Sequence, residues 1–425
     1  MTFCAIDFGT SNSAVAVPEA GGGTRLIALE AGQSTMPTAV FYAVEPGSPQ
    51  PPELHYGRAA LAAYVDGFDG RLMRSMKSVL GSPLVTQDTD LGAGHRVKYL
   101  DVITAFLRHL KVQAEAQTGA PIRRAVLGRP VFFVDEDPAR DAAAQDALAT
   151  AARAVGFEEL RFQYEPIAAA LDHERTAARE ELVLVADIGG GTSDFSLVRV
   201  GPRRQDKLQR QDDILASHGV HVAGTDFDRR VELEAVLPSC GFRGRGPGGR
   251  EVPSRVYHDL ATWHLINTVY TPPRVAELRG MKDFYADAAQ HRRLMKVVQQ
   301  HLGHALGALA EGAKIDVARQ GRADIDLSLL EPGLRAALEE AQALQALDAD
   351  LQRIAEAALE TVRRAGVAPE AVDALYFTGG STGLKPLTDR IAAAFPAARA
   401  VRGERFASVA QGLGLHAARC FGVAH

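Results

Sequence analysis

Two segments far apart in the sequence share one order of apolar and polar positions. AIDFGTSNSAVAV at 5–17 and VADIGGGTSDFSLVRV at 185–200 each predict a strand, an Asp-x-Gly turn followed by Thr and Ser, and a returning strand. Both copies keep Asp, Gly and Thr in the same order after an apolar run. The pattern predicts two β-hairpins and a lobe that is duplicated within the chain.

Alternating strand and helix patterns lie between and after these hairpins. We expect a helix over 100–117, a buried strand at 125–134, an alanine-rich helix at 141–155 and amphipathic helices within 331–365. A strand at 374–377 leads into a third glycine turn and a helix. This alternation indicates an α/β fold. The predicted buried face of the first helix contains Val102, Ile103, Phe106, Leu107 and Leu110.

The length of 425 residues is too great for one ordinary hydrophobic core, so we expect two lobes. The first lobe is assigned to residues 1–178, with an inserted subdomain at about 38–99. The second is assigned to 179–404, with a mainly helical insertion at about 224–315. Residues 405–425 predict a C-terminal helix that packs back toward the first lobe.

Composition and charge narrow the range of partners. Hydrophobic residues make up 46% of the chain and charged residues 23%, as in folded globular proteins. The net charge of -5 gives no field that would attract nucleic acid or an anionic membrane, so a small molecule or a protein is the expected partner. The segment CGFRGRGPGGREVP at 240–253 predicts a flexible, exposed loop.

The cysteines and the apolar runs bear on the compartment. Cys4, Cys240 and Cys420 lie far apart without a metal-ligand spacing, so we expect small buried thiols in a reducing compartment. The N-terminus lacks the pattern of a signal peptide, and no apolar run reaches the roughly 18 residues of a membrane span. The sequence therefore predicts a cytoplasmic protein.

The glycine turns have the composition of a phosphate site. A nucleoside triphosphate needs several backbone N–H donors close to its oxygens, and glycine lets the backbone approach closely. The carboxylates of Asp7, Asp187 and Asp194 suit a hydrated Mg²⁺ ion, which keeps several waters. The third turn can contact the nucleotide or be a plain connection from strand to helix. The candidate binding residues of the three turns are Gly9, Thr10, Ser11, Asn12, Gly189, Gly190, Gly191, Thr192, Gly379, Gly380 and Ser381.

Between residue 3 and about residue 415 the chain contains, in this order, the motifs AIDFGTSNS, MKSVLG at 76–81, YEPIAAAL at 164–171, ADIGGGTSDFS at 186–196, GVHVAGTDFD at 219–228 and FTGGST at 377–382. These motifs and their order resemble the ATPase domain of heat shock protein 70 (DnaK-type) chaperones. Within that family the chain is most similar to the short YegD-type members. The resemblance implies an actin-like ATPase fold, built from ribonuclease H-like duplicated lobes with inserted subdomains, that binds ATP or ADP with Mg²⁺.

The resemblance also implies roles for single residues. Asp7 and Asp187 are expected in the metal shell, and Lys77 at the terminal phosphate, where its charge would stabilise the transferred group. Glu165, which precedes Pro166, would position the attacking water together with Asp187 and Asp194. The implied catalytic set is Lys77, Glu165, Asp187, Asp194 and Thr192.

The nucleoside end follows the family pattern less closely. Gly224 is expected near the ribose phosphates, and Glu311 and Lys314, three residues apart on one helix face, at the ribose hydroxyls. An ordinary exposed charge pair is the alternative for these two residues. The departures from the family are Ile315 and Gly383, which replace adenine-stacking arginines, and Ala318, which replaces a common serine.

The implied function is slow ATP hydrolysis, with a conformational change that an unidentified partner protein or co-chaperone detects. Because the chain ends at GLHAARCFGVAH, we expect no peptide-binding domain and hence a chaperone-like ATPase. A nucleotide-dependent interaction protein with little turnover is one alternative. A small-molecule kinase of the same superfold is another.

Overall fold

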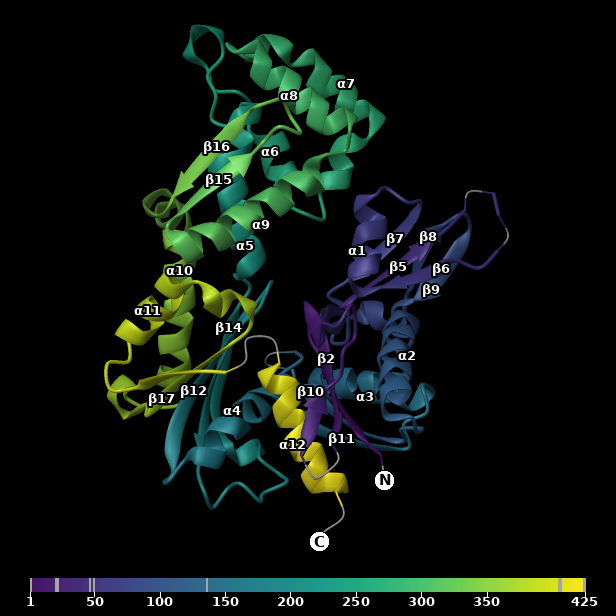
Figure 1. Ribbon diagram of the computed structural model, residues 1–425, viewed down its shortest axis with the longest axis vertical. Coiled ribbons are helices and arrows are strands. Elements are labelled where there is room, and N and C mark those ends of the chain that lie inside the picture. Colours follow the sequence, from purple (N-terminus) through teal and green to yellow (C-terminus); the bar gives the residue numbers. More distant parts are fainter. Residues whose placement is uncertain are drawn as a thin grey trace. The chain divides into compact units, whose positions relative to one another are not determined.

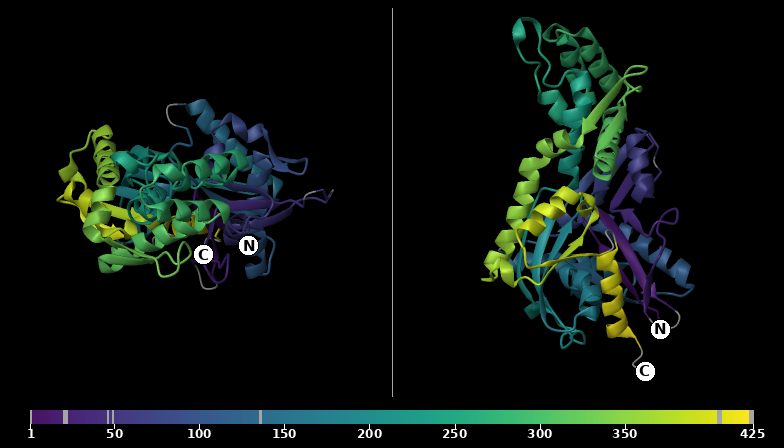
Figure 2. Two further views of the ribbon diagram at one scale, coloured as in Figure 1. Left: turned by 90° about the horizontal axis from the view of Figure 1, so that it is seen from above. Right: turned by 60° about the vertical axis from the view of Figure 1, so that its left-hand side comes forward.

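The computed structural model describes residues 2–19, 23–45, 47–48, 50–134, 137–403 and 407–422. The chain forms two compact units (Figures 1 and 2). The first consists of Met1–Val220, Glu356–Thr382 and Ile391–His425, and the second of His221–Ala355 and Gly383–Arg390.

The N-terminal sheet of the first unit has the strand order β11-β10-β1-β2-β3, with β4 also paired to β2. β1 runs parallel to β10 and antiparallel to β2, which confirms the first predicted hairpin. Successive residues of β1 alternate between two apolar clusters, because side chains of a strand point to opposite faces. The strands are β1 (Cys4–Phe8), β2 (Asn12–Pro18), β3 (Thr24–Leu26), β4 (Thr35–Pro37), β10 (Arg124–Arg129) and β11 (Glu159–Tyr164).

One face of this sheet packs against α2 (Tyr99–Thr118) and α3 (Pro138–Ala154). The predicted helix over 100–117 is confirmed, and all five residues of its expected apolar face are buried. α2 ends where Gly119 takes the left-handed conformation that terminates many helices. The strand predicted to reach residue 134 was wrong in its second half. It ends at Arg129, before Pro130, which has no N–H to donate to a neighbouring strand.

The segment 38–99 forms a small addition to the first unit, with a three-stranded sheet and a separate hairpin. The sheet order is β6-β5-β7, and α1 packs against β5. β8 and β9 form a separate hairpin. A 3₁₀ turn at Met76–Val79 follows β7 and carries Lys77. These elements are β5 (Ala39–Ala43), β6 (Glu53–Tyr56), α1 (Gly57–Val65), β7 (Gly70–Arg74), β8 (Asp88–Gly92) and β9 (His95–Lys98).

A second sheet of the first unit has the order β14-β13-β12-β17-β18. β12 and β13 form the second predicted hairpin, and β17 lies parallel to β12 on its other side. The predicted strand at 374–377 is thereby confirmed. The strands are β12 (Glu181–Ile188), β13 (Ser193–Val200), β14 (Ile214–Val220), β17 (Ala374–Thr378) and β18 (Arg399–Arg402).

Two helices, α4 (Glu165–Thr176) and α12 (Ser408–Phe421), join the sheets of the first unit. α12 contacts α4 and strands β1, β2 and β10, and Figures 1 and 2 show it beside the N-terminal strands. One buried apolar cluster includes residues of both helices and of both sheets, such as Ala5, Ala168, Val185 and Leu413. Both hairpins are thus anchored in one core. Residues 405–406 and 423–425 of the predicted C-terminal segment lie outside the described residues.

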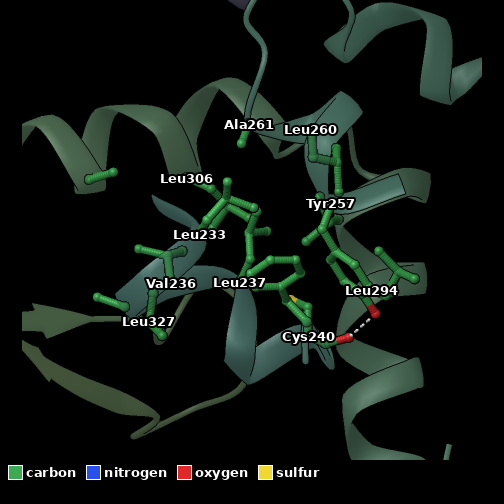
Figure 3. Packing of buried hydrophobic residues seen from close by; sticks show 14 of the residues in the cluster. Leu233, Val236, Leu237, Cys240, Tyr257, Leu260, Ala261, Leu294, Leu306 and Leu327 are labelled. Carbon is green, nitrogen blue, oxygen red and sulfur yellow. Dashed lines mark hydrogen bonds between the residues drawn. The ribbon is translucent and has the colours of Figure 1, made fainter. Parts of the chain in front are cut away.

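The second unit is mainly helical, with a hairpin of β15 and β16. Its core is apolar, and inside it the Tyr257 hydroxyl donates to the Cys240 carbonyl at 2.8 Å (Figure 3). A π-helical turn at Glu232–Val236 continues α5. The elements are α5 (Gly224–Val231), α6 (Arg255–Leu260), α7 (Pro272–Gly280), α8 (Ala288–Gln299), α9 (Gly303–Gln320), β15 (Arg322–Asp326) and β16 (Arg335–Glu339).

The helical prediction within 331–365 was wrong for its first part. Residues 335–339, RAALE, form β16, although Ala, Leu and Glu favour helix. Pairing with β15, which buries Leu338 and Ala323, overrides that local preference. The remainder is helical in α10 (Glu340–Arg364), and α11 (Lys385–Ala393) follows the third glycine turn.

Several smaller expectations can be compared with the structure. The arginines of the segment 240–253 are exposed, as predicted. The prediction was wrong for Cys240, Phe242 and Val252, which are buried in the apolar core of the second unit. Cys4 and Cys240 are buried and Cys420 is half-buried, and all three are free thiols. Within the described residues, no helix combines the length and apolar character needed to cross a membrane.

Candidate functional site

The first Asp-Gly hairpin presents a short turn next to a carboxylate. Asp7 lies on β1 opposite Ala14 of β2. A Cβ atom at Gly9 would lie 2.2 Å from the carbonyl oxygen of Asn12, so the turn can close only with glycine at this position. Residues 9–11 are partly accessible. Backbone N–H groups of this turn can therefore approach an anion.

The second hairpin has an additional side-chain hydrogen bond. The Gly189 N–H donates to the Thr192 carbonyl at 3.0 Å and closes the turn. The Thr192 hydroxyl donates to Oδ2 of Asp194 at 2.7 Å, and Asp194 lies opposite Asp187 across β12 and β13. A Cβ atom at Gly191 would meet no atom within 4 Å, so the backbone is open there. This turn also has the form of an anion site.

The third glycine turn packs directly against the second hairpin. Gly379 has a φ of +87°, and a Cβ atom there would lie 2.4 Å from the Ile188 carbonyl oxygen and 2.7 Å from Oδ1 of Asp187. The Ser381 hydroxyl donates to the Gly189 carbonyl at 2.7 Å. Gly380 begins the 3₁₀ turn that follows. The structure thus brings the second and third predicted turns together around Asp187.

Lys77 and Glu165 form a buried ion pair between two separate parts of the first unit. The Lys77 ammonium donates to Oε1 of Glu165, and the side chains are only 9% and 15% exposed. Glu165 is the first residue of α4, and Pro166 follows in the first helical turn. A Cβ atom at Gly128 would lie 3.2 Å from Cγ and Oε1 of Glu165. Glycine at the end of β10 therefore leaves room for this carboxylate.

The electrostatics show that these side chains form one charged cluster. Burial raises the pKa of Asp7 to about 8, with a further increase from Glu165. Burial likewise raises the pKa of Asp187 to about 7, and Asp194 and Glu165 add to that rise. Burial alone would lower the pKa of Lys77, but Glu165, Asp7 and Asp187 raise it overall. Three carboxyl groups, those of Glu165, Asp7 and Asp187, thus share one lysine, and Asp194 adds negative charge beside Asp187. An added cation would stabilise this arrangement.

The donor set fits a hydrated magnesium ion bound to phosphate. Among the described side chains, no group of three or more His, Cys, Asp or Glu residues is placed to hold a metal ion directly. Asp7 and Asp187 can bind Mg²⁺ through its waters, since this ion gives up its water shell reluctantly. The glycine turns beside both carboxylates supply neutral donors for phosphate oxygens.

Sequence reasoning missed two glycines of this site. Gly128 makes space for Glu165, and a Cβ atom at Gly219 of β14 would lie 2.4 Å from Oδ1 of Asp194. Gly219 lies opposite Asp194 in the sheet. Its place in the motif GVHVAGTDFD was a possible signal, whereas nothing around Gly128 marks it in the sequence.

The predicted nucleoside residues belong to the second unit. Gly224 is buried at the start of α5, and Glu311 and Lys314 lie on α9. The Lys314 ammonium lies 2.6 Å from Oδ1 of Asp228, a partner that sequence reasoning missed. Burial raises the pKa of Asp228 to about 6, while Lys314 opposes the rise. On the same helix Ile315 is 39% exposed, and Ala318 and Glu311 are also exposed.

Comparison with known proteins links this site to one family. The family model described as "Hsp70 protein" matches residues 74–234, which include Lys77, Glu165 and Asp187. A chaperone protein HscA homolog of Methylobacillus flagellatus is 31% identical over 239 residues, covering 53% of this chain and 36% of that protein. A chaperone protein DnaK of Thermosipho melanesiensis is 30% identical over 228 residues, covering 53% and 34%. The matched region spans about a third of the length of these relatives.

Proposed function

The chain belongs to the Hsp70 family, and from this premise we propose that it binds Mg-ATP at the two Asp-Gly hairpins and hydrolyses it slowly. The family implies the actin-like ATPase fold, and the α/β architecture with mixed sheets agrees with it. The division into lobes at 1–178 and 179–404 is part of the proposal. The observation that best supports this proposal is the buried Lys77–Glu165 ion pair beside the carboxylates of Asp7 and Asp187.

The proposed mechanism depends on positioning and charge. An ammonium group has three N–H donors, and Lys77 gives one to Glu165, which leaves two for oxygens of a terminal phosphate. Glu165, Asp187 and Asp194 would orient a water molecule, because phosphoryl transfer depends more on alignment and charge stabilisation than on a strong base. When bound, Mg²⁺ would neutralise phosphate charge, and its waters would bind Asp7 and Asp187.

The remaining assignments rest on the resemblance to the family. We assign phosphate contacts to the turns at 9–12, 189–192 and 379–381. Gly224, Glu311 and Lys314 are assigned to the nucleoside. The nucleotide-dependent change would be detected by a partner protein or co-chaperone. The relatives' description as chaperone proteins supports a chaperone-type role.

Calorimetry with Mg-ATP and a phosphate-release assay test this proposal. We expect the unmodified protein to bind and slowly hydrolyse ATP, and Asp187→Asn to lose hydrolysis. Asp324→Asn is the matched control, because this carboxylate is 62% exposed on β15 of the second unit. No binding by the unmodified protein, or equal hydrolysis by both variants, would refute the proposal.

The exposed Ile315 favours one alternative, a nucleotide-dependent interaction protein with little turnover, because it offers no stacking guanidinium to adenine. Tight ATP binding without phosphate release would support this alternative. Transfer of phosphate to a metabolite in a substrate screen would instead indicate a small-molecule kinase. Affinity capture with Asp187→Asn in ATP, compared with nucleotide-free protein, would identify the partner.

A further inference from the structure

A buried hydrogen-bond chain connects the turn before Glu165 to α12. Oε1 of Gln163 accepts from the Tyr164 N–H at 2.8 Å, and Nε2 of Gln163 lies 3.0 Å from Nδ1 of His416. Gln163 and His416 are each 3% exposed. Nε2 of His416 lies 3.4 Å from the sulfur of Cys420, one helical turn further along α12.

This chain determines which imidazole nitrogen carries the proton. The Gln163 oxygen is occupied by the Tyr164 N–H, so its amide nitrogen donates to His416. Nδ1 of His416 must then be an acceptor, and the single proton of the neutral ring lies on Nε2, facing Cys420. Burial, with a smaller effect of Arg419, lowers the pKa of His416 to about 4, which agrees with a neutral ring.

Two close approaches, each at a glycine, place the same face of α12 against the first turn of α4, where Glu165 lies. A Cβ atom at Gly412 would lie 1.8 Å from the Ala168 carbonyl oxygen, so α12 and α4 approach backbone to backbone. A Cβ atom at Gly128 would lie 3.0 Å from Leu413 and 3.2 Å from Glu165, so both side chains meet at this glycine. These α12 residues share a face with His416, because residues three and four apart are neighbours on a helix.

We propose that α12 positions Glu165 for the hydrolysis step, with His416 as the positioning residue and Gln163 as the link. The inference rests on the proposed ATPase function. The Tyr164 peptide sets the direction in which α4 begins, and Glu165 is the first residue of that helix. Without His416, the Gln163 amide loses its buried partner and no longer fixes the Tyr164 N–H. Glu165 then shifts relative to Lys77, and small displacements of catalytic groups slow a reaction strongly.

Two substitutions of His416 separate positioning from general stability. His416→Leu removes the acceptor, and we expect kcat for ATP hydrolysis to fall about tenfold while KM changes less than about twofold. His416→Asn places an amide oxygen near the former Nδ1 and should keep kcat within about twofold of the unmodified protein. If His416→Leu does not fold, Gln163→Met removes the same bond from the strand and should show the same loss.

Phe421→Leu is the matched control on the same helix. Phe421 is 6% exposed and packs against Phe3, with ring centroids 6.1 Å apart, and it makes none of the contacts described for the Glu165 turn. This variant should lower the melting temperature and leave kcat unchanged. An equal kcat loss in Phe421→Leu, no loss in His416→Leu, or no rescue by His416→Asn overturns the inference.

Histidine ¹⁵N NMR of the nucleotide-free protein gives a readout that does not need ATPase activity. We expect one histidine fixed in the Nε2–H tautomer between pH 6 and pH 8, with its signal absent in His416→Asn. A charged ring or the Nδ1–H tautomer at pH 7 overturns the hydrogen-bond chain. If the unmodified protein does not hydrolyse ATP, the proposed function fails, while the NMR result still tests the contact between His416 and Gln163.

Discussion

Removing the charge of Lys77 tests whether the buried ion pair holds the site together. Lys77→Met keeps most of the side-chain volume but leaves the 15% exposed Glu165 carboxylate without its cation, close to Asp7 and Asp187. Breaking a buried ion pair by removing one partner costs about 3–5 kcal/mol in folded proteins. We expect a loss of about 3 kcal/mol in the free energy of unfolding at pH 7.5, because residual exposure reduces the cost.

The stability effect of Lys77→Met should depend on pH, and the direction follows from the pKa values of Lys77 and the neighbouring carboxyl groups. The raised pKa of Lys77 means that its charge stabilises the folded protein below the unfolded pKa of 10.5, and this contribution is lost as the pH rises through the higher folded pKa. The contribution is therefore complete between pH 5.5 and pH 7.5. In the variant, protonation of Asp7 and Asp187 at the lower pH removes buried negative charge, because burial raises the pKa values of both carboxyl groups. The loss in the free energy of unfolding caused by Lys77→Met should therefore be smaller at pH 5.5 than at pH 7.5.

Thermal unfolding followed by circular dichroism at both pH values measures this effect. The double variant Lys77→Met with Glu165→Gln should recover most of the stability, because a neutral amide needs no cation, but should remain inactive in phosphate release. Lys385→Met is the control. Its pair with Asp389 is 71% and 55% exposed, and such pairs contribute about 0.5 kcal/mol or less. An unchanged melting temperature in Lys77→Met, or no recovery in the double variant, would show that the pair is not a stabilising unit.

Three further predictions concern other parts of the chain. Calorimetry of Mg-ATP binding at pH 7 in buffers of different ionisation enthalpy should show release of about one to two protons. Asp7, with a pKa of about 8, and Asp187, with a pKa of about 7, must lose their protons near the cation. Asp7→Asn should release fewer protons, and buffer-independent heats in the unmodified protein would contradict this. Gly379→Ala should lower the melting temperature and weaken ATP binding because its Cβ would lie 2.4 Å from a carbonyl oxygen, whereas Gly366→Ala, with a φ of +68° and no atom within 4 Å, should retain binding. Burial raises the pKa of Glu232 to about 8 in the folded protein. The protonated carboxyl therefore stabilises the second unit fully below the pKa of 4.5 that it has in the unfolded chain, and this stability is lost as the pH rises through 8. Glu232→Gln should therefore be more stable than the unmodified protein at pH 9 by on the order of 2 kcal/mol. The same difference in melting temperature between the two proteins at pH 5 and at pH 9 would refute this.

The two hairpins could be predicted from the sequence because their signals are local. Alternating apolar residues and turn glycines lie within a few positions of each other, and tight turns require them there. The contact between Lys77 and Glu165 joins residues 88 positions apart. No local pattern predicts this contact, and only the resemblance to the family assigned both residues to one site.

The residues and contacts that could not be predicted from the sequence depend on neighbours in the tertiary structure. Gly128 and Gly219 have ordinary local contexts, and their importance arises from side chains of other elements that approach them. Gln163 lies in a strand where polar and apolar residues alternate, so it does not stand out, and its partner His416 is 253 positions away. The β16 segment was misassigned for a related reason, since its composition favours helix and only β15 determines its conformation.

The parallel pairing of β12 with β17 affects the order in which the chain can fold. β12 is complete by Ile188, but β17 begins only at Ala374, after nearly the whole second unit has been synthesised. During synthesis, the second unit can bury its own core while one edge of β12 still lacks its neighbour. An unpaired apolar edge favours aggregation. An incomplete chain that ends before Ala374 would thus carry a β12 strand with one unpaired apolar edge.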